Sequence, residues 1–141
     1  MVSPSSESFL ARLPSRLDWD RLGIGLSGLC AVHCLLTPLL LAALPLWPNA
    51  WAMHAWLHPT LVALLLPVTA FAAWDAHRHG GGAHVPWLLG VGFLLVAVAW
   101  LGHDLWGAVG EAAGTLLGSG LLVTGHALNW RRHRSAHVPT T

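Results

Sequence analysis

The sequence predicts an all-α protein: a four-helix transmembrane bundle with up-down topology and both termini in the cytoplasm. Three observations predict it, namely the composition, a long stretch without charged residues, and the positions of arginine and tryptophan. The chain of 141 residues is 55% hydrophobic and only 9% charged. In an average soluble domain about a quarter of the residues are charged. The composition therefore indicates a membrane protein, with the lipid bilayer as its first partner.

The uncharged stretch is too long for a single span. No Asp, Glu, Lys or Arg occurs between residues 22 and 74. As one helix this stretch would be about 80 Å long, far more than the roughly 30 Å of a hydrocarbon core. The stretch must therefore fold back on itself, and a soluble domain of this size could not bury so much apolar surface.

Prolines and glycines divide the chain into segments. We expect a polar leader over residues 1–21 without a cleavable signal peptide, a four-span membrane domain over residues 22–130, and a basic tail over residues 131–141. Four helices joined by short connections favour an up-down bundle. The predicted helices cover residues 22–44, 57–74, 86–101 and 111–130. The connections predicted between them cover residues 49–55, 75–85 and 103–110.

Tryptophan and arginine support this division. The nine tryptophans fall near the ends of the predicted helices, as expected for a residue that prefers the membrane–water interface. All the arginines lie in the leader, in the connection after the second helix, or in the tail. Because cytoplasmic segments carry the excess of positive charge, both termini and the 75–85 connection are predicted to face the cytoplasm.

Both cysteines of the chain, Cys30 and Cys34, lie four residues apart in the first predicted helix, with His33 beside them. Helical neighbours at that spacing share one face, with Cβ atoms about 5–6 Å apart. A disulfide needs about 3.5–4.5 Å, so free thiols or metal ligands are favoured. Thiolates select soft cations such as Cu(I) and Hg(II), and imidazole suits zinc and copper. We interpret Cys30, Cys34 and His33 as metal ligands; packing of small apolar thiols is the alternative.

Three further histidines are weaker candidates for metal ligation. His54 and His58 lie one turn apart at the outer end of the second helix, a spacing that suits a cation but equally an interfacial pair without a role. His126 lies with Asn129 at the cytoplasmic end of the fourth helix, where hydrogen bonding between helices is favoured over ligation. Glu111 adds negative potential at the outer side, although a role as an acidic residue at a helix N-terminus is favoured.

Histidines of the inner connection and the tail would face the cytoplasm and could receive an ion there, but solvated loop histidines usually have no special role. They are His77, His79, His84, His133 and His137. No catalytic motif is present, neither a Gly-x-Ser-x-Gly elbow, nor a phosphate-binding loop, nor a zinc-protease helix. We therefore expect no enzyme and assign no resident cofactor. The net charge of +1 and the scattered arginines give no nucleic-acid surface.

A glycine stripe marks the last predicted helix. Gly110, Gly114 and Gly118 repeat every four residues. Small residues at this spacing let two helix backbones approach closely, either inside a bundle or between protomers. The stripe thus predicts either an internal contact or a homo-oligomer.

The chain resembles the MerC-domain family of membrane proteins over roughly residues 18–134. The resemblance rests on Ser27-Gly28-Leu29-Cys30-Ala31-Val32-His33-Cys34-Leu35-Leu36-Thr37-Pro38, on the four-span layout, and on His126-Ala127-Leu128-Asn129-Trp130-Arg131. It implies a small four-helix protein of the bacterial inner membrane that takes Hg(II) into the cytoplasm in mercury resistance.

The family's cysteine pair in the first helix carries over to Cys30 and Cys34. This chain departs from the family pattern in two ways, because three residues separate its cysteines and its tail contains no cysteine. Its histidine content favours Zn(II) as a second candidate ion.

The leading hypothesis is thus a passive metal-ion transporter or metal-binding protein that passes Hg(II), or Zn(II), toward the cytoplasm. The first alternative is a membrane anchor or redox subunit that binds haem between His33 and His126, since histidines on facing helices supply axial ligands. The second alternative is a structural subunit that packs through the glycine stripe and binds no ion.

Overall fold

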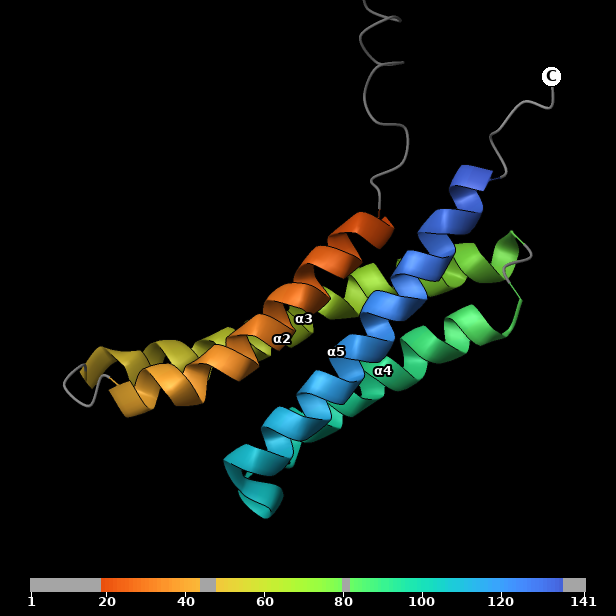
Figure 1. Ribbon diagram of the computed structural model, residues 1–141. Coiled ribbons are helices and arrows are strands. Elements are labelled where there is room, and N and C mark those ends of the chain that lie inside the picture. The colour runs from red at the N-terminus through yellow and green to blue at the C-terminus, as the bar shows by residue number, and fades with distance from the viewer. Residues whose placement is uncertain (1–18, 44–47, 80–81, 136–141) are drawn as a thin grey trace, which may run out of the picture.

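The computed structural model describes residues 19–43, 48–79 and 82–135, except for the side chains of residues 38, 40–43 and 48–55. Within these ranges the chain is all-helical, as the sequence predicts (Figure 1). The helices are α2 (Trp19–Ala43), α3 (Pro48–Arg78), α4 (His84–Leu101) and α5 (His103–Ser135). Gly107, at φ 63°, ψ −176°, interrupts α5 near its start.

Each helix packs against the next one along the chain, and α2 also packs against α5. The start of α2 lies beside the end of α5, where Asp20 bonds to Asn129. The start of α4 lies at the same end, because His84 contacts Arg132 of α5. In Figure 1 the α2–α3 pair and the α4–α5 pair diverge away from this end. The up-down topology and the cytoplasmic termini stay predictions.

The distribution of polar and apolar side chains suits a lipid environment. The large apolar side chains Leu29, Leu35, Phe71 and Leu117 are more than half exposed. Several polar side chains are instead buried between the helices, among them Asp20, Ser27, His58, Thr115, Ser119, His126 and Asn129. Soluble proteins show the opposite preference, whereas polar groups of membrane proteins face the bundle interior.

Two of the described helical stretches are long and apolar enough to cross a membrane, Trp56–Arg78 and His84–Leu101. The number of four spans stays a prediction. The structure nevertheless gives these two helices apolar outer faces, with Trp74 and Trp87 exposed near the end that carries His84.

The glycine stripe packs inside the chain. A Cβ atom on Gly118 would lie 2.7 Å from the Gly92 carbonyl oxygen of α4, and one on Gly114 would lie 2.8 Å from Ala99 Cβ. Gly120, on another face of α5, has no neighbour within 4 Å. Gly114 and Gly118 therefore let α5 approach α4 closely. A homo-oligomer through Gly110, Gly114 and Gly118 stays a prediction, but two of these glycines already serve the α4–α5 contact.

Two predicted connections are wrong, because the chain is helical there. Residues 49–55 belong to α3, which begins at Pro48, and proline suits the first turn of a helix. Residues 103–110 belong to α5, where the positive φ of Gly107 permits a sharp break instead of a loop.

The helices also extend beyond their predicted ends. Helix α2 begins at Trp19 rather than residue 22, with Asp20 in its first turn, and α5 continues to Ser135 with arginines in its last turn. Charges of these signs complement the helix macrodipole at those ends. Helix α3 continues to Arg78 and shortens the predicted 75–85 connection. The division into leader, membrane domain and tail stays a prediction, since residues 1–18 and 136–141 lie outside the described residues.

Candidate metal site

Helices α2 and α5 meet along a row of small and polar residues. On α2 the row consists of Asp20, Gly23, Ser27, Cys30 and Cys34, and on α5 of Glu111, Thr115, Ser119, His126 and Asn129. Residues three or four apart share a helix face, and this spacing places each set on one side of its helix.

Contacts along this α2–α5 row follow one antiparallel register. Gly23 lies against His126, Cys30 beside Ser119, and Cys34 beside Thr115. Each step toward the end of α2 thus corresponds to a step toward the start of α5. From Cys34 to Asp20 the row is about 21 Å long, at roughly 1.5 Å per residue, which is most of a hydrocarbon core of about 30 Å.

The two cysteines face the bundle interior rather than lipid. Cys30 is 1% exposed and Cys34 is 6% exposed. Both are free thiols, and they lie next to each other. The structure therefore provides a buried pair of soft sulfur ligands one helical turn apart.

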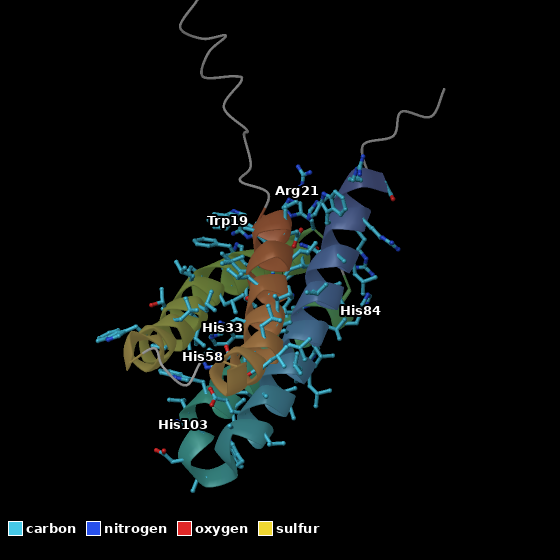
Figure 2. The ribbon with its side chains drawn as sticks, turned by 60° about the vertical axis from the view of Figure 1, so that its left-hand side comes forward. Trp19, Arg21, His33, His58, His84 and His103 are labelled. Carbon is cyan, nitrogen blue, oxygen red and sulfur yellow. The ribbon has the colours of Figure 1, made fainter. Side chains whose placement is uncertain are left out.

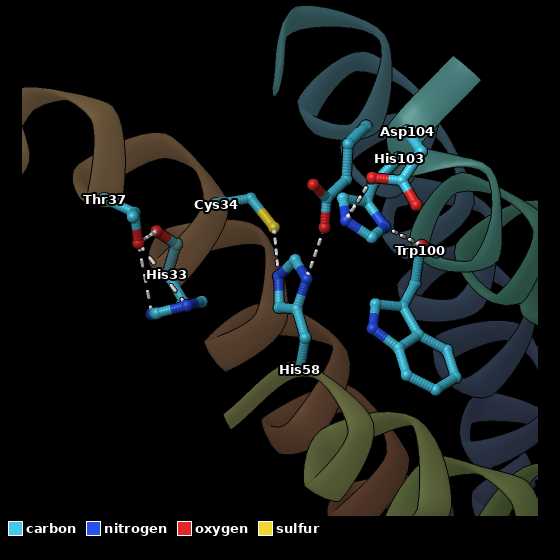
Figure 3. Close-up of polar contacts among 8 residues, drawn as sticks. His33, Cys34, Thr37, His58, Trp100, His103 and Asp104 are labelled. Carbon is cyan, nitrogen blue, oxygen red and sulfur yellow. Dashed lines mark hydrogen bonds and ion pairs between the residues drawn. The ribbon is translucent and has the colours of Figure 1, made fainter. Parts of the chain in front are cut away.

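His58 of α3 joins this pair to α5. Its Nε2 lies 3.2 Å from Cys34 Sγ, and its Nδ1 lies 2.6 Å from Glu111 Oε1. Figure 3 shows the imidazole between the thiol and the carboxylate. The side chains of His58 and Glu111 are only 8% and 14% exposed. A thiol, an imidazole and a carboxylate from three helices thus form one continuous chain of contacts.

This chain of contacts changes the interpretation of two residues. The sequence favours a helix-terminal role for Glu111, and Glu111 does lie four residues after the helix break at Gly107, but its carboxylate also pairs with His58. The predicted partner of His58 was His54, whose side chain lies outside the described residues. Helical spacing relates residues of one helix only, so the sequence could not show that Cys34, His58 and Glu111 meet.

His33 lies at the edge of the site. Its ring is half-buried, 3.4 Å from Thr37 Oγ1, and its carbonyl oxygen accepts a hydrogen bond from the Thr37 hydroxyl at 2.7 Å. The His33 and His58 rings meet edge to face, with centroids 5.4 Å apart. In Figure 3 His33 lies beside Thr37, whereas the Cys34 thiol points to His58. The structure thus brings His58, rather than His33, to the cysteine pair.

The site is not a complete cage of ligands. Within the described residues, no group of three or more His, Cys, Asp or Glu side chains is arranged so as to hold a metal ion. The two thiols are therefore the donors that the structure supplies together, with one imidazole nitrogen beside them. Two-coordinate soft cations need no more than two thiolates, whereas structural zinc sites have four ligands.

A second buried cluster lies at the other end of the α2–α5 row. Asp20 Oδ1 is 3.1 Å from His126 Nδ1, and Asp20 Oδ2 accepts a hydrogen bond of 2.9 Å from Asn129 Nδ2. His126 is fully buried and Asn129 is 2% exposed. The hydrogen bonding between helices that the sequence favours for His126 and Asn129 is present. The sequence does not predict this role for Asp20, because Asp20 lies in the predicted polar leader. Its position just before the first apolar stretch is the signal that could have indicated it.

The position of His126 rules out the haem pairing. His126 packs on Gly23, and Gly23 lies ten residues before His33 on the same helix, about 15 Å along its axis. Axial ligands must approach one iron from its two sides, so His33 and His126 cannot both bind it. Gly23 is also seven residues from Cys30, about 10 Å along the axis, so His126 does not share an ion with the cysteines.

Four further histidines contact a polar or charged side chain near the surface. His84 Nε2 lies 2.6 Å from an Arg132 nitrogen, and Asp75 contacts both His79 and His133, at 3.1 Å and 2.9 Å. At the opposite end His103 pairs with the exposed Asp104 at 3.0 Å. Figure 2 shows His84 and His103 far from each other, with His33 and His58 between the two ends. A role of the inner histidines as a relay stays a prediction, and His137 lies outside the described residues.

The sequence of the chain matches one known protein family. A family model described as MerC mercury resistance protein matches residues 20–131. The chain belongs to the MerC family. The match begins at Asp20 and includes both buried clusters of this MerC protein. Neither the curated proteins nor the solved structures contain a match to it. The family match and the apolar outer faces of the helices identify a membrane protein associated with mercury resistance.

Proposed function

We propose that this MerC protein binds Hg(II) between Cys30 and Cys34 and passes it toward the cytoplasm, as a multi-pass protein of the bacterial inner membrane. The observation that carries the proposal is the buried, reduced cysteine pair inside the bundle. Thiolates are the ligands that soft cations prefer. A polar cluster at membrane depth costs free energy, so its presence indicates a function.

His58 and Glu111 can accept and stabilise a proton that a cysteine releases when the metal ion binds. A thiol binds a metal ion as thiolate, so binding releases protons. His58 Nε2, at 3.2 Å from Cys34 Sγ, is placed to accept the proton that this thiol loses. The Glu111 carboxylate at His58 Nδ1 then stabilises the resulting imidazolium. The second proton leaves to solvent. Without this pair, deprotonation of a thiol in a low-dielectric interior is opposed by the cost of a buried charge.

Zn(II) is the second candidate ion, but the described residues form no group of three His, Cys, Asp or Glu side chains that could hold it. The donor set favours Hg(II), because two thiolates complete its coordination and zinc needs four ligands.

Titration of the purified protein with Hg(II) tests the proposal. We expect the wild type to bind Hg(II) at its thiols with one ion per chain, seen as the ultraviolet thiolate-to-metal absorption. The Cys30→Ser/Cys34→Ser variant should lack that absorption entirely. The His103→Ala variant, changed at an exposed histidine outside the site, is the control and should match the wild type.

Two results would speak against the proposal. One is a wild-type protein whose thiols bind no Hg(II) although they are reduced and the protein is folded. The other is a purified protein with a haem Soret band, which would support the redox alternative with ligands other than the pair His33 and His126.

A further inference from the structure

His126 has a ring nitrogen without a partner. Its Nε2 makes no hydrogen bond within the described residues, although the side chain is fully buried. Leaving a buried polar atom without a hydrogen bond is costly in proteins. Polar groups inside a membrane bundle are candidates for a functional site.

Asp20 prepares this nitrogen to bind a cation. The carboxylate at 3.1 Å from Nδ1 holds the proton of a neutral imidazole on Nδ1, which leaves the lone pair on Nε2. Histidines that bind metal ions almost always donate their other N–H in this way, and the partner fixes the tautomer and the ring orientation. Asn129 donates to the second oxygen of Asp20 and fixes the carboxylate in turn.

One buried hydroxyl, that of Ser27, lies on the α2–α5 row between Cys30 and Gly23. It makes no hydrogen bond within the described residues. The hydroxyls of Ser119 and Thr115 lie beside Cys30 and Cys34 themselves. A buried oxygen atom without a partner thus lies between the cysteine pair and His126.

We propose that His126 Nε2 is a second binding station for the cation, on the path from the cysteines to the Asp20 end of the bundle. The inference rests on the proposed function, because the ion that arrives at His126 is the one that leaves Cys30 and Cys34. Its ligand class is a soft or borderline divalent cation, which imidazole accepts and holds less tightly than two thiolates do. The Ser27 hydroxyl offers an oxygen atom to the ion, or to its water, between the two stations.

The test uses full-length Cys30→Ser/Cys34→Ser protein in lipid nanodiscs, with histidine rings labelled with nitrogen-15 and Hg(II) as the probe. Removal of the thiols isolates the second station from the first. We expect the Nε2 resonance of His126 to shift on addition of Hg(II), and its titration to give an affinity. That resonance is assigned by its absence from the His126→Asn variant.

Two further variants separate ligation from a structural role. The Asn amide of His126→Asn still donates to Asp20 but lacks Nε2, so this variant should stay folded by thermal unfolding and bind one Hg(II) fewer per chain. Asp20→Asn should lower the affinity at His126 about 10–100-fold, the usual effect of removing such a partner from a metal-binding histidine. His84→Asn, changed at an exposed histidine that pairs with Arg132, should leave the His126 shift unchanged.

An unshifted His126 Nε2 resonance at saturating Hg(II) would overturn the second station. So would equal Hg(II) binding by the His126→Asn variant and its parent. The cysteine site is measured separately, through the thiolate absorption of the wild type. If that absorption appears while His126 does not respond, the second station fails and the proposed function stands. If neither appears, both fail.

Discussion

Cells that express the Cys30→Ser/Cys34→Ser variant should accumulate Hg(II) no faster than cells with an empty vector. Wild-type cells should accumulate it several-fold faster. The reason is that the two buried sulfurs are the only thiols of the chain, and a hydroxyl is a poor ligand for a soft cation. Serine has nearly the shape of cysteine, so the exchange removes ligation with little change in packing. The measurement is uptake of radioactive Hg(II) at equal membrane content of protein.

Two controls make the uptake result specific. His103→Ala, at an exposed position outside the site, should transport as the wild type does. The double variant should show the same amount in the membrane and the same helical content. Uptake by the double variant at the wild-type rate would eliminate the cysteines from transport, whatever they bind in the purified protein.

Replacement of His58 by alanine should lower the free energy of unfolding by about 1–3 kcal/mol, the usual cost of leaving a buried polar group without its hydrogen-bond partner. His58 is 6% exposed and contacts both Cys34 and Glu111. Without it the buried Glu111 carboxylate loses the imidazole nitrogen that it contacts. Unfolding of the purified protein in a denaturing detergent series measures the loss, without metal and at neutral pH.

The comparison for His58→Ala is His103→Ala, which removes an exposed histidine from an exposed pair. Exposed pairs contribute about 0–1 kcal/mol, so that variant should lose little. The double variant His58→Ala/Glu111→Ala should recover part of the loss, because it leaves no charge without a partner. Equal stability of His58→Ala and His103→Ala would show that the Cys34–His58–Glu111 contacts do not hold the helices together.

Much of the fold could be predicted because the membrane restricts the choice of structure. Apolar stretches with few charges must be helical to satisfy their backbone in lipid, and prolines and glycines indicate where they divide. The ends of the helices are harder to predict from the sequence. Residues 49–55 contain Trp and His, and residues 103–110 contain Trp, His and Gly, so both resemble connections. The chain nevertheless continues as helix through them, with a break at Gly107.

Only the part of the candidate site that lies within one helix could be predicted from the sequence. The spacing of Cys30 and Cys34 places both thiols on one face of α2 without knowledge of any other segment. The contacts of Cys34 with His58, and of His58 with Glu111, join residues far apart in sequence. No spacing rule relates such residues, and the same is true of Asp20 with His126 and Asn129.

The two clusters together give this small chain two places where a cation could bind. One is a pair of thiols with an imidazole and a carboxylate, and the other is an imidazole held by a carboxylate and an amide. Both lie on the α2–α5 row, and the outer surface of the bundle remains apolar. The account therefore depends on one claim, that Hg(II) is held by both sulfurs at once inside the bundle.

X-ray absorption at the mercury edge tests this claim most directly. Wild-type protein loaded with one equivalent of Hg(II) in lipid should show two sulfur neighbours for each mercury atom. The Cys30→Ser and Cys34→Ser single variants should each lose one of them. A mercury atom with a single sulfur neighbour in the wild type, or with sulfur neighbours contributed by two different chains, would contradict the account.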